Sequence, residues 1–443
     1  MKRFFEFLHA KGVTPSTINQ TIFKWTSTEL LDFIVESRAA VPRPRPVASS
    51  IFDFVTNSTL SGGVRPCSSL ECRLRQADKL ARYAALYADR VLIRDPLEKY
   101  WDITKINDLV RATVAGDLLV LYYLRPLLEK GILEIASQWV ALCKKHLKEV
   151  TQMEEAFRRK LTKAQRLLES KHIKHVKATL KGEDQMPFIE ITGVDSLTGH
   201  SPVVIELLEL PPLMAKQFDG AKPYSLSERD LRKFGIFDFL IDPILDDLFI
   251  QNWYSVMYGS SYLTDREPDI DALRVINDRQ TNVQNDALLE GLSHTVPFIY
   301  DVDLAKLVRL REVEGESFHV YRDALSATLS SVRGLDPVRI REAFQDQIRP
   351  ELNRIDLAIK NSRKLLWNSV KIEGLVAAGW VGIGLFSGVL PPNIGEIVAA
   401  LGGFQFVSRT LEKLIKSGQE PAQIRENSYY FLWKVREVAS PKG

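Results

Sequence analysis

The feature that most constrains this chain is a long stretch without charge near its carboxyl end. Residues 374–395 read GLVAAGWVGIGLFSGVLPPNIG and hold no Asp, Glu, Lys or Arg, although charged residues make up 26% of the chain. A bilayer-spanning helix needs about 20 apolar residues, and Gly374 to Leu390 offers about 25 Å of helix. Pro391 and Pro392 then predict a turn. This stretch has to be hidden from water in a core, in lipid or against a second subunit.

The residues after the turn, IGEIVAALGGFQFV, predict a second helical arm. Small residues that recur at every fourth position would let the two arms pack closely, as at membrane helix interfaces. They are Gly374, Ala378 and Gly382 on the first arm and Gly395, Ala399 and Gly403 on the second. Basic residues flank both arms on one side, as in a hairpin that enters a membrane from the cytoplasm. We expect this C-terminal hairpin to serve membrane insertion or self-association. The alternative, favoured by Glu396, is a hairpin fully buried in a helical domain.

The totals place the chain among intracellular globular proteins. Its 443 residues are enough for two or three domains. A net charge of +3 means that a nucleic-acid partner has to be argued from a local patch. Three cysteines are too few for a disulfide framework and fit a reducing interior. Charged residues interrupt the amino-terminal apolar run where a signal peptide would have none. We therefore expect a cytoplasmic protein, with conditional membrane association through the hairpin.

Hydrophobic periodicity predicts a predominantly helical α+β fold with a small βαβ and hairpin sheet element. Residues 91–136 show a strand, helix, strand pattern typical of a βαβ unit, and residues 187–209 resemble a β-hairpin. Ser225 and Glu228 form a candidate capping box. Five regions follow from the shifts in composition: a small helical N-terminal module (1–41), a Pro/Ser/Gly-rich linker (42–68), an α/β domain with a basic helix (69–210), a helical middle domain (211–335) and a helical C-terminal domain with the hairpin (336–443).

Several segments resemble segments of bacterial proteins of unknown function. They include YADRVLIRDP, LLVLYYLRPLLEKGIL, SYLTDREPDIDALRV and VPFIYDVDLAKLVRLREVEGESFHVYRDAL. The resemblance covers about residues 69–438 and implies a bacterial cytosolic origin and a link to conflict or phage-defence proteins. It assigns no catalytic residue.

A strongly basic helix is expected from about Gln138 to Lys171. Between Lys144 and Lys181 the chain has twelve Lys and Arg against four Glu. A stripe of this kind can bind phosphate backbones or an acidic protein surface, or it can be a solvated face. The candidate binding residues are Lys144, Lys145, Lys148, Arg158, Arg159, Lys160, Lys163 and Arg166.

An acidic row is the candidate metal site. Asp238, Asp242 and Asp246 stand at four-residue spacing in an apolar helix. Like charges at that spacing repel each other, so we expect either a divalent metal or cations such as Arg309 and Arg311 to face them.

Three further patterns are compatible with ligands. Two Glu-x-x-His pairs, Glu169 with His172 and Glu316 with His319, have the spacing used in di-iron bundles, although the lysines around His172 favour a solvated ring. Cys67, Cys72, Cys143 and His146 offer a Cys3His zinc set. Asp95 ends an expected strand, where ligand-binding residues of α/β sheets collect, and also precedes a proline, as turn initiators do.

No sequence motif identifies a reaction. The chain has no Walker lysine, no Gly-rich phosphate loop after the strand and no Gly-x-Ser-x-Gly elbow. We therefore expect no cofactor and a non-enzymatic effector or accessory factor that uses its hydrophobic hairpin on a membrane or a second copy. The alternatives are a metal-dependent enzyme that acts on nucleic acid, with the acidic row and the basic helix as its parts, and a scaffold that binds another protein.

Overall fold

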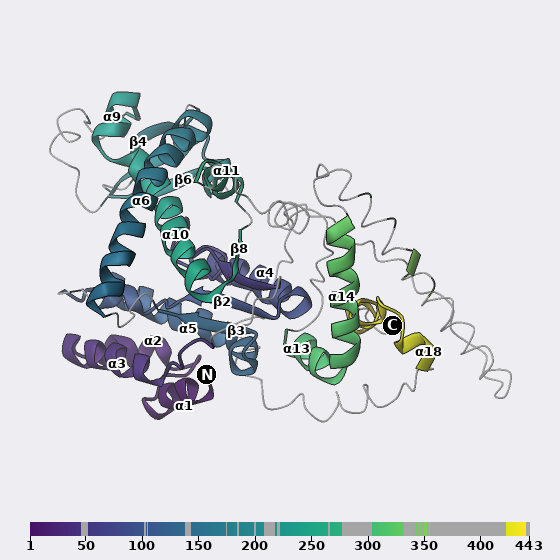
Figure 1. Cartoon of the computed structure of the whole chain (residues 1–443). Coiled ribbons are helices and arrows are strands. Elements are labelled where there is room, and N and C mark those ends of the chain that lie inside the picture. The colour runs from purple at the N-terminus through teal and green to yellow at the C-terminus, as the bar shows by residue number, and fades with distance from the viewer. Residues whose placement is uncertain are drawn as a thin grey trace, which may run out of the picture.

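The protein is an α+β chain, mostly helical, with two small four-stranded sheets (Figure 1). The computed structural model describes residues 1–45, 52–101, 103, 105–137, 143–173, 175–183, 186–198, 201–207, 218, 222–264, 266–276, 304–331 and 422–439, together with Glu342, Asp346, Pro350, Glu351 and Arg354. The C-terminal hairpin, residues 374–407, lies outside the described residues, so its burial stays a prediction.

The three amino-terminal helices share one core with the helices that follow. They are α1 (Lys2–Ala10), α2 (Ile18–Lys24) and α3 (Ser27–Ala40). A capping box between Thr26 and Glu29 starts α3. Helix α2 packs on α5 (Asp108–Lys130), and the Tyr122 hydroxyl of α5 donates to the carbonyl oxygen of Val13 at 2.5 Å. This bond satisfies a buried polar group where α1 joins α2.

The first sheet is parallel and has the strand order β3-β2-β1-β8. Its strands are β1 (Asp53–Thr56), β2 (Arg90–Arg94), β3 (Leu133–Ala136) and β8 (Ser261–Leu263). Helix α4 (Leu70–Tyr87) connects β1 to β2, and α5 connects β2 to β3. The expected βαβ unit is confirmed, because β2 and β3 pair in parallel across α5. Strand β1, which pairs with both β2 and β8, lies within the range expected to be a linker.

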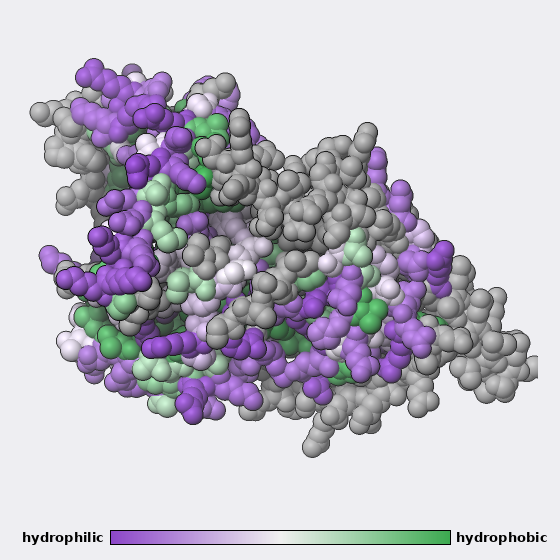
Figure 2. Space-filling view, in the orientation of Figure 1, coloured by the Kyte–Doolittle hydropathy of each residue, from purple (hydrophilic) through white to green (hydrophobic). Residues whose placement is uncertain are grey.

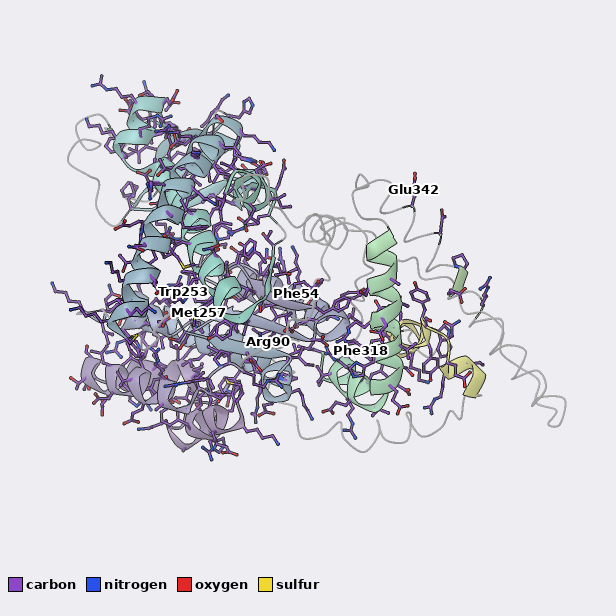
Figure 3. The ribbon with its side chains drawn as sticks, in the orientation of Figure 1. Phe54, Arg90, Trp253, Met257, Phe318 and Glu342 are labelled. Carbon is purple, nitrogen blue, oxygen red and sulfur yellow. The ribbon has the colours of Figure 1, made fainter. Side chains whose placement is uncertain are left out.

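Alternate side chains of the parallel sheet enter different cores, as the two-residue period of a strand requires. Phe54, Val91 and Ile93 pack with residues of α4 and α5. Val55 and Leu92 pack with residues of α10 (Ile236–Tyr258). Figure 3 shows Phe54 in the sheet, with Trp253 and Met257 on the end of α10 that reaches it. The sheet is therefore covered by helices on both faces.

The second sheet is antiparallel, with the order β6-β5-β4-β7. Its strands are β4 (Lys177–Glu183), β5 (Met186–Thr192), β6 (Val203–Glu206) and β7 (Tyr224–Leu226). The expected hairpin is confirmed by the antiparallel pairing of β5 with β6, and a short helix, α7 (Asp195–Thr198), lies in the connection. Alternate residues such as Ala178, Leu180 and Ile191 are buried in the second core.

Two long helices run side by side between the two sheets (Figure 1). Helix α6 (Lys144–Leu168) leads from the parallel to the antiparallel sheet, and α10 leads back; Pro243 lies inside α10. Helix α9 (Glu228–Lys233) precedes α10, and α11 (Glu267–Ile276) follows β8. The capping box of α9 is formed by Ser227 and Asp230, so the expected box of Ser225 and Glu228 is wrong. Ser225 belongs to β7, where strand pairing fixes its backbone.

The described carboxyl-terminal elements pack against the first core. They are α13 (Leu304–Val313), α14 (Gly315–Ser331), α18 (Ala422–Arg425) and α19 (Tyr430–Ala439). Helices α13 and α14 are separated at Glu314, next to Gly315, a residue that weakens helices. Phe318 of α14 (Figure 3) meets Phe431 of α19 edge to face, with the ring centroids 5.0 Å apart.

Candidate nucleic-acid interface

Helix α6 is amphipathic, and its apolar side fixes which side faces water. Phe157, Ala164 and Leu168 recur at helical spacing and are buried in the second core. The helix contacts α10 and α11 along this side, and the rings of Phe157 and Phe249 lie 6.0 Å apart. Because a residue turns about 100° around the axis, the lysines and arginines of α6 fall mostly on the opposite side.

That opposite side is the basic face that the sequence predicts. Eight of the 25 residues of α6 are Lys or Arg, against three Glu. All eight side chains are exposed. No carboxylate among the described residues forms an ion pair with any of them, although ion pairs are common elsewhere in the chain. The basic face consists of Lys144, Lys145, Lys148, Arg158, Arg159, Lys160, Lys163 and Arg166.

The exposed cations lie in two groups, one at residues 144–148 and one at residues 158–166, along a helix about 37 Å long. Figure 2 shows hydrophilic side chains over the part of the molecule that holds α6, α9 and β4. Arg158 also lies over the Phe249 ring at 4.7 Å from its centroid, which holds its stem against α10. The remaining cations have the length and freedom to reach an external polyanion.

A pocket opens at the carboxyl end of the basic face. Its volume is about 510 Å³, and the walls come from α6, β4, β7, α9 and α10. Arg232 crosses it and pairs with Glu169 at 3.0 Å and with Glu228 at 3.2 Å. The remaining lining residues are Arg166, Ser170, Ile173, Val176, Lys177, Ser225, Leu226, Leu231 and Phe237. We call this the α6-end pocket.

A single turn of π-helix, Glu169–Ile173, ends α6 and turns His172 inward. Turns of this kind are frequent at functional sites. His172 is buried, with Nδ1 3.0 Å from Ser196 Oγ and Nε2 3.0 Å from Asp271 Oδ2. The expectation of a solvated His172 ring is therefore wrong. The neighbouring Lys171 donates to the same Asp271 oxygen at 2.5 Å, so the group ties α6 to α7 and α11.

A second polar cluster lies where the order of the parallel sheet reverses. Strand β1 is followed by β2 on one side and has β8 on the other, and ligands of open α/β sheets bind at the carboxyl ends of strands at such a point. The guanidinium of Arg266, just after β8, donates to Asp247 at 3.0 Å and to Asp269 at 2.9 Å. Asn57 and Thr264 also donate to Asp269.

This Arg266 cluster fills the space that a ligand would take. Ser58 donates to Asp247 through its backbone N–H at 3.2 Å and through its hydroxyl at 2.9 Å, which closes the loop after β1. Burial raises the pKa of Asp247, while Arg266 acts in the opposite direction. The cavity beside Arg266 and Thr59 measures about 20 Å³, which is room for one water. The cluster stabilises the fold, and its own side chains fill the space at the carboxyl ends of the strands.

The acidic row is exposed rather than partly buried. Asp238, Asp242 and Asp246 all face solvent on α10, and the buried carboxylate of that helix is the neighbouring Asp247. Desolvation by neighbouring protein atoms raises the pKa of Asp242, and the charges of Asp238 and Asp246 raise it further. The cations proposed to face the row lie elsewhere: Arg309 pairs with Glu312 and Arg311 donates to backbone carbonyls of α4. The three carboxylates do not form a group that could hold a metal ion in the described part of the chain, so a metal at the row remains a prediction from the sequence.

The structure assembles none of the other expected metal sets within the described part of the chain. No group of three or more His, Cys, Asp or Glu side chains there is close enough to hold a metal ion. His319 is exposed on α14, and Cys143 is exposed at the start of α6. Burial and the neighbouring Cys67 raise the pKa of the Cys72 thiol, which opposes the thiolate that zinc requires.

Asp95 ends β2 as expected, and its contacts are those of a turn. Its carboxylate accepts the N–H of Leu97 at 2.9 Å, and its own N–H donates to the carbonyl of Ala136. Burial raises the pKa of Asp95 to about 6. These contacts agree with the turn-initiating role that the following proline favours.

Comparison of the chain with protein-family models, curated proteins and solved structures finds no match. None of the described helices is both long enough and apolar enough to span a bilayer. Function has therefore to be argued from the site itself.

The basic face could be predicted from the sequence, whereas the pocket and the contacts of His172 could not. The basic face is local, because one helix carries it. Ser196 and Asp271 lie 24 and 99 residues from His172. The available signal was the helical position of His172, which places it on the apolar side of α6 despite its lysine neighbours.

Proposed function

We propose that this protein binds nucleic acid along its phosphate backbone through the basic face of α6. The observation that supports the proposal is a row of eight exposed cations on one helix, none of them paired with a carboxylate of the described residues. Neutralisation of phosphates by Lys and Arg releases condensed counterions and drives such binding. A solvated helix normally mixes its charges, whereas α6 carries eight Lys and Arg against three Glu.

The binding is expected to be largely independent of sequence. Phe157 is the aromatic residue of α6, and it is buried, so the basic face has no ring on which bases could stack. Lysines and arginines that contact phosphates fix position but read no base.

The burial of the apolar side argues against a membrane as the partner of α6. An interfacial helix lies with its apolar face in the lipid, but Phe157, Ala164 and Leu168 are already in the second core. A flexible polyanion that needs only the charged face is the better match.

Charge reversal tests the proposal. The variant with Lys148→Glu, Arg159→Glu and Lys163→Glu should lose most of its affinity for a fluorescein-labelled 20-nucleotide strand in fluorescence anisotropy. The unaltered protein should bind more weakly as salt rises, with a slope of log K against log salt of about −3 to −5 for roughly five phosphate contacts.

The matched control carries the same charge change elsewhere. Lys2, Arg3 and Lys24 are exposed on α1 and α2, so Lys2→Glu, Arg3→Glu and Lys24→Glu also shift the net charge from +3 to −3. The control should bind much as the unaltered protein does. Equal loss in both variants, or binding that does not respond to salt, contradicts a specific role of the basic face. If the unaltered protein binds an acidic protein such as casein and does not bind nucleic acid, the basic face is assigned to a protein partner.

A second proposal concerns the C-terminal hairpin and comes from sequence alone. The charge-free segment with small residues at every fourth position favours membrane insertion or self-association. Gly382→Leu and Ala399→Leu would place bulk between the two arms and should abolish co-sedimentation with vesicles or oligomer formation. Absence of both behaviours in the unaltered protein would leave the buried hairpin of a protein-binding scaffold.

A further inference from the structure

The α6-end pocket is continuous with the basic face. Arg166 belongs to both, and Lys177 at the start of β4 adds a second exposed cation on the same rim. Neither is in an ion pair with a described residue, so both are available to an anionic group. A phosphate chain that follows α6 therefore arrives at this opening.

Part of the pocket lining is apolar. Ile173, Leu226, Leu231 and Phe237 line it and are at least nine-tenths buried. A volume of about 510 Å³ lies within the range of small-molecule sites. The guanidinium of Arg232 lies over the Phe237 ring, 4.9 Å from its centroid. The planar guanidinium is a surface on which a π system can stack.

The opposite rim is polar without being strongly negative. Arg232 bridges Glu169 and Glu228, so it offsets one of their two negative charges. Ser170 and Ser225 add hydroxyl groups. Carboxylates and hydroxyls can accept and donate along the edge of a nucleobase, while the two free cations face a phosphate.

We infer that the α6-end pocket takes one unstacked nucleotide of a single strand whose backbone lies on the basic face of α6. The inference rests on the proposed function. A base in a duplex is stacked and paired, so it enters a pocket only at the cost of unstacking. The protein should therefore bind single strands more tightly than duplex of the same sequence, although both contact the basic face.

Anisotropy with a 12-nucleotide single strand and its duplex tests the inference. We expect about tenfold tighter binding of the single strand, the size of one base–aromatic or base–apolar contact. Ser225→Trp, at an exposed strand position on the pocket rim, should fill the pocket and remove that tenfold preference while duplex binding stays unchanged. Val204→Trp, at an exposed position of β6 that does not line the pocket, is the matched control.

A second variant covers the case in which Ser225→Trp does not fold, which thermal melting would show. Lys177→Gln removes a rim cation without touching the core and should weaken single-strand binding severalfold, by a larger factor than duplex binding, which depends mainly on the eight cations of the basic face. Equal affinity for strand and duplex in the unaltered protein, or a preference that survives both variants, overturns the inference.

Two other outcomes distinguish a failure of the pocket inference from a failure of the proposed nucleic-acid binding. Salt-independent or undetectable binding of both nucleic acids means that the proposed function itself has failed. The second outcome is that adenosine monophosphate binds the unaltered protein as tightly as the 12-nucleotide strand and competes with it. In that case the pocket takes a free nucleotide, and the inference of a single strand is overturned.

Discussion

The guanidinium of Arg266 lies 3.0 Å from the carboxylate of Asp247, and this contact joins the end of β8 to the middle of α10. Asp269 approaches the same guanidinium at 2.9 Å from the other side. Both carboxylates are buried, so each depends on the arginine for its counter-charge.

Arg266→Leu should therefore lower the free energy of unfolding by about 3–5 kcal/mol at neutral pH, because two buried carboxylates lose their cation. Burial already raises the pKa of Asp247, so its native state holds its proton more tightly than the unfolded chain does, and stability falls as pH rises through that pKa. Loss of Arg266 strengthens this effect. Urea unfolding should show a smaller deficit at pH 5 than at pH 7.5.

The control for this prediction is Arg309→Leu, at an exposed arginine that pairs with Glu312 on the surface of α13. It should change the free energy of unfolding by less than about 1 kcal/mol. A deficit of Arg266→Leu that is small or independent of pH contradicts the role assigned to the cluster.

Asp271→Asn should destabilise the protein by about 1–2 kcal/mol at pH 7, because His172 and Lys171 lose a charged acceptor. Burial raises the pKa of Asp271, but the hydrogen bonds from Lys171 and His172 outweigh it and lower the pKa overall. Its contribution is therefore present above the unfolded pKa of about 3.9 and is lost as pH falls through the folded value. The difference in melting temperature between the two proteins should vanish as pH falls below the folded pKa of Asp271, and a difference that persists in acid would show that packing is responsible.

Asp242→Asn should stabilise α10 slightly, by about 0.3–0.5 kcal/mol, because it removes the middle of three like charges at four-residue spacing. The pKa of Asp242 is raised, so the repulsion is fully present above that pKa and disappears in acid. Thermal melting at pH 7 measures the gain. Melting in millimolar Mg²⁺ tests the metal proposal as well: a rise that Asp242→Asn abolishes would establish the acidic row as a cation site.

Gly62→Ala should cost about 1–3 kcal/mol. Gly62 has φ +82°, and a Cβ there would lie 2.6 Å from Val120 Cγ1 on α5 and 3.2 Å from the carbonyl oxygen of Arg73. Gly12→Ala is the matched control, because Gly12 has φ +72° but open space around its missing Cβ. Chemical denaturation of both variants separates the steric clash from the backbone strain that they share. Equal losses would rule out the clash.

Local patterns made part of this fold predictable. The short strand at 91–94, the amphipathic α5 and the strand after Gly131 can each be predicted from the residues that form them. Strands β1 and β8 have four and three residues and pair across about 200 positions, so no local period marks them. Propensity favours a loop in such short polar-ended runs, and tertiary pairing overrides it.

The candidate site divides in the same way. The basic face of α6 could be predicted, because a helical period and a count of charges suffice to place it. The α6-end pocket could not, since its walls come from five elements between Arg166 and Phe237 that only the folded chain brings together. The expectation that the His172 ring is solvated is based on its lysine neighbours. It is wrong because adjacent residues on a helix point in different directions.

Helix α10 contributes residues to both the α6-end pocket and the Arg266 cluster. Phe237 lies at the α6-end pocket and Asp247 at the Arg266 cluster, ten positions or about 15 Å apart on one helix. Pro243 lies between them, has no N–H to complete the helical ladder and leaves one carbonyl without its usual donor. The helix that connects the two sheets therefore lacks one backbone hydrogen bond between its two polar regions.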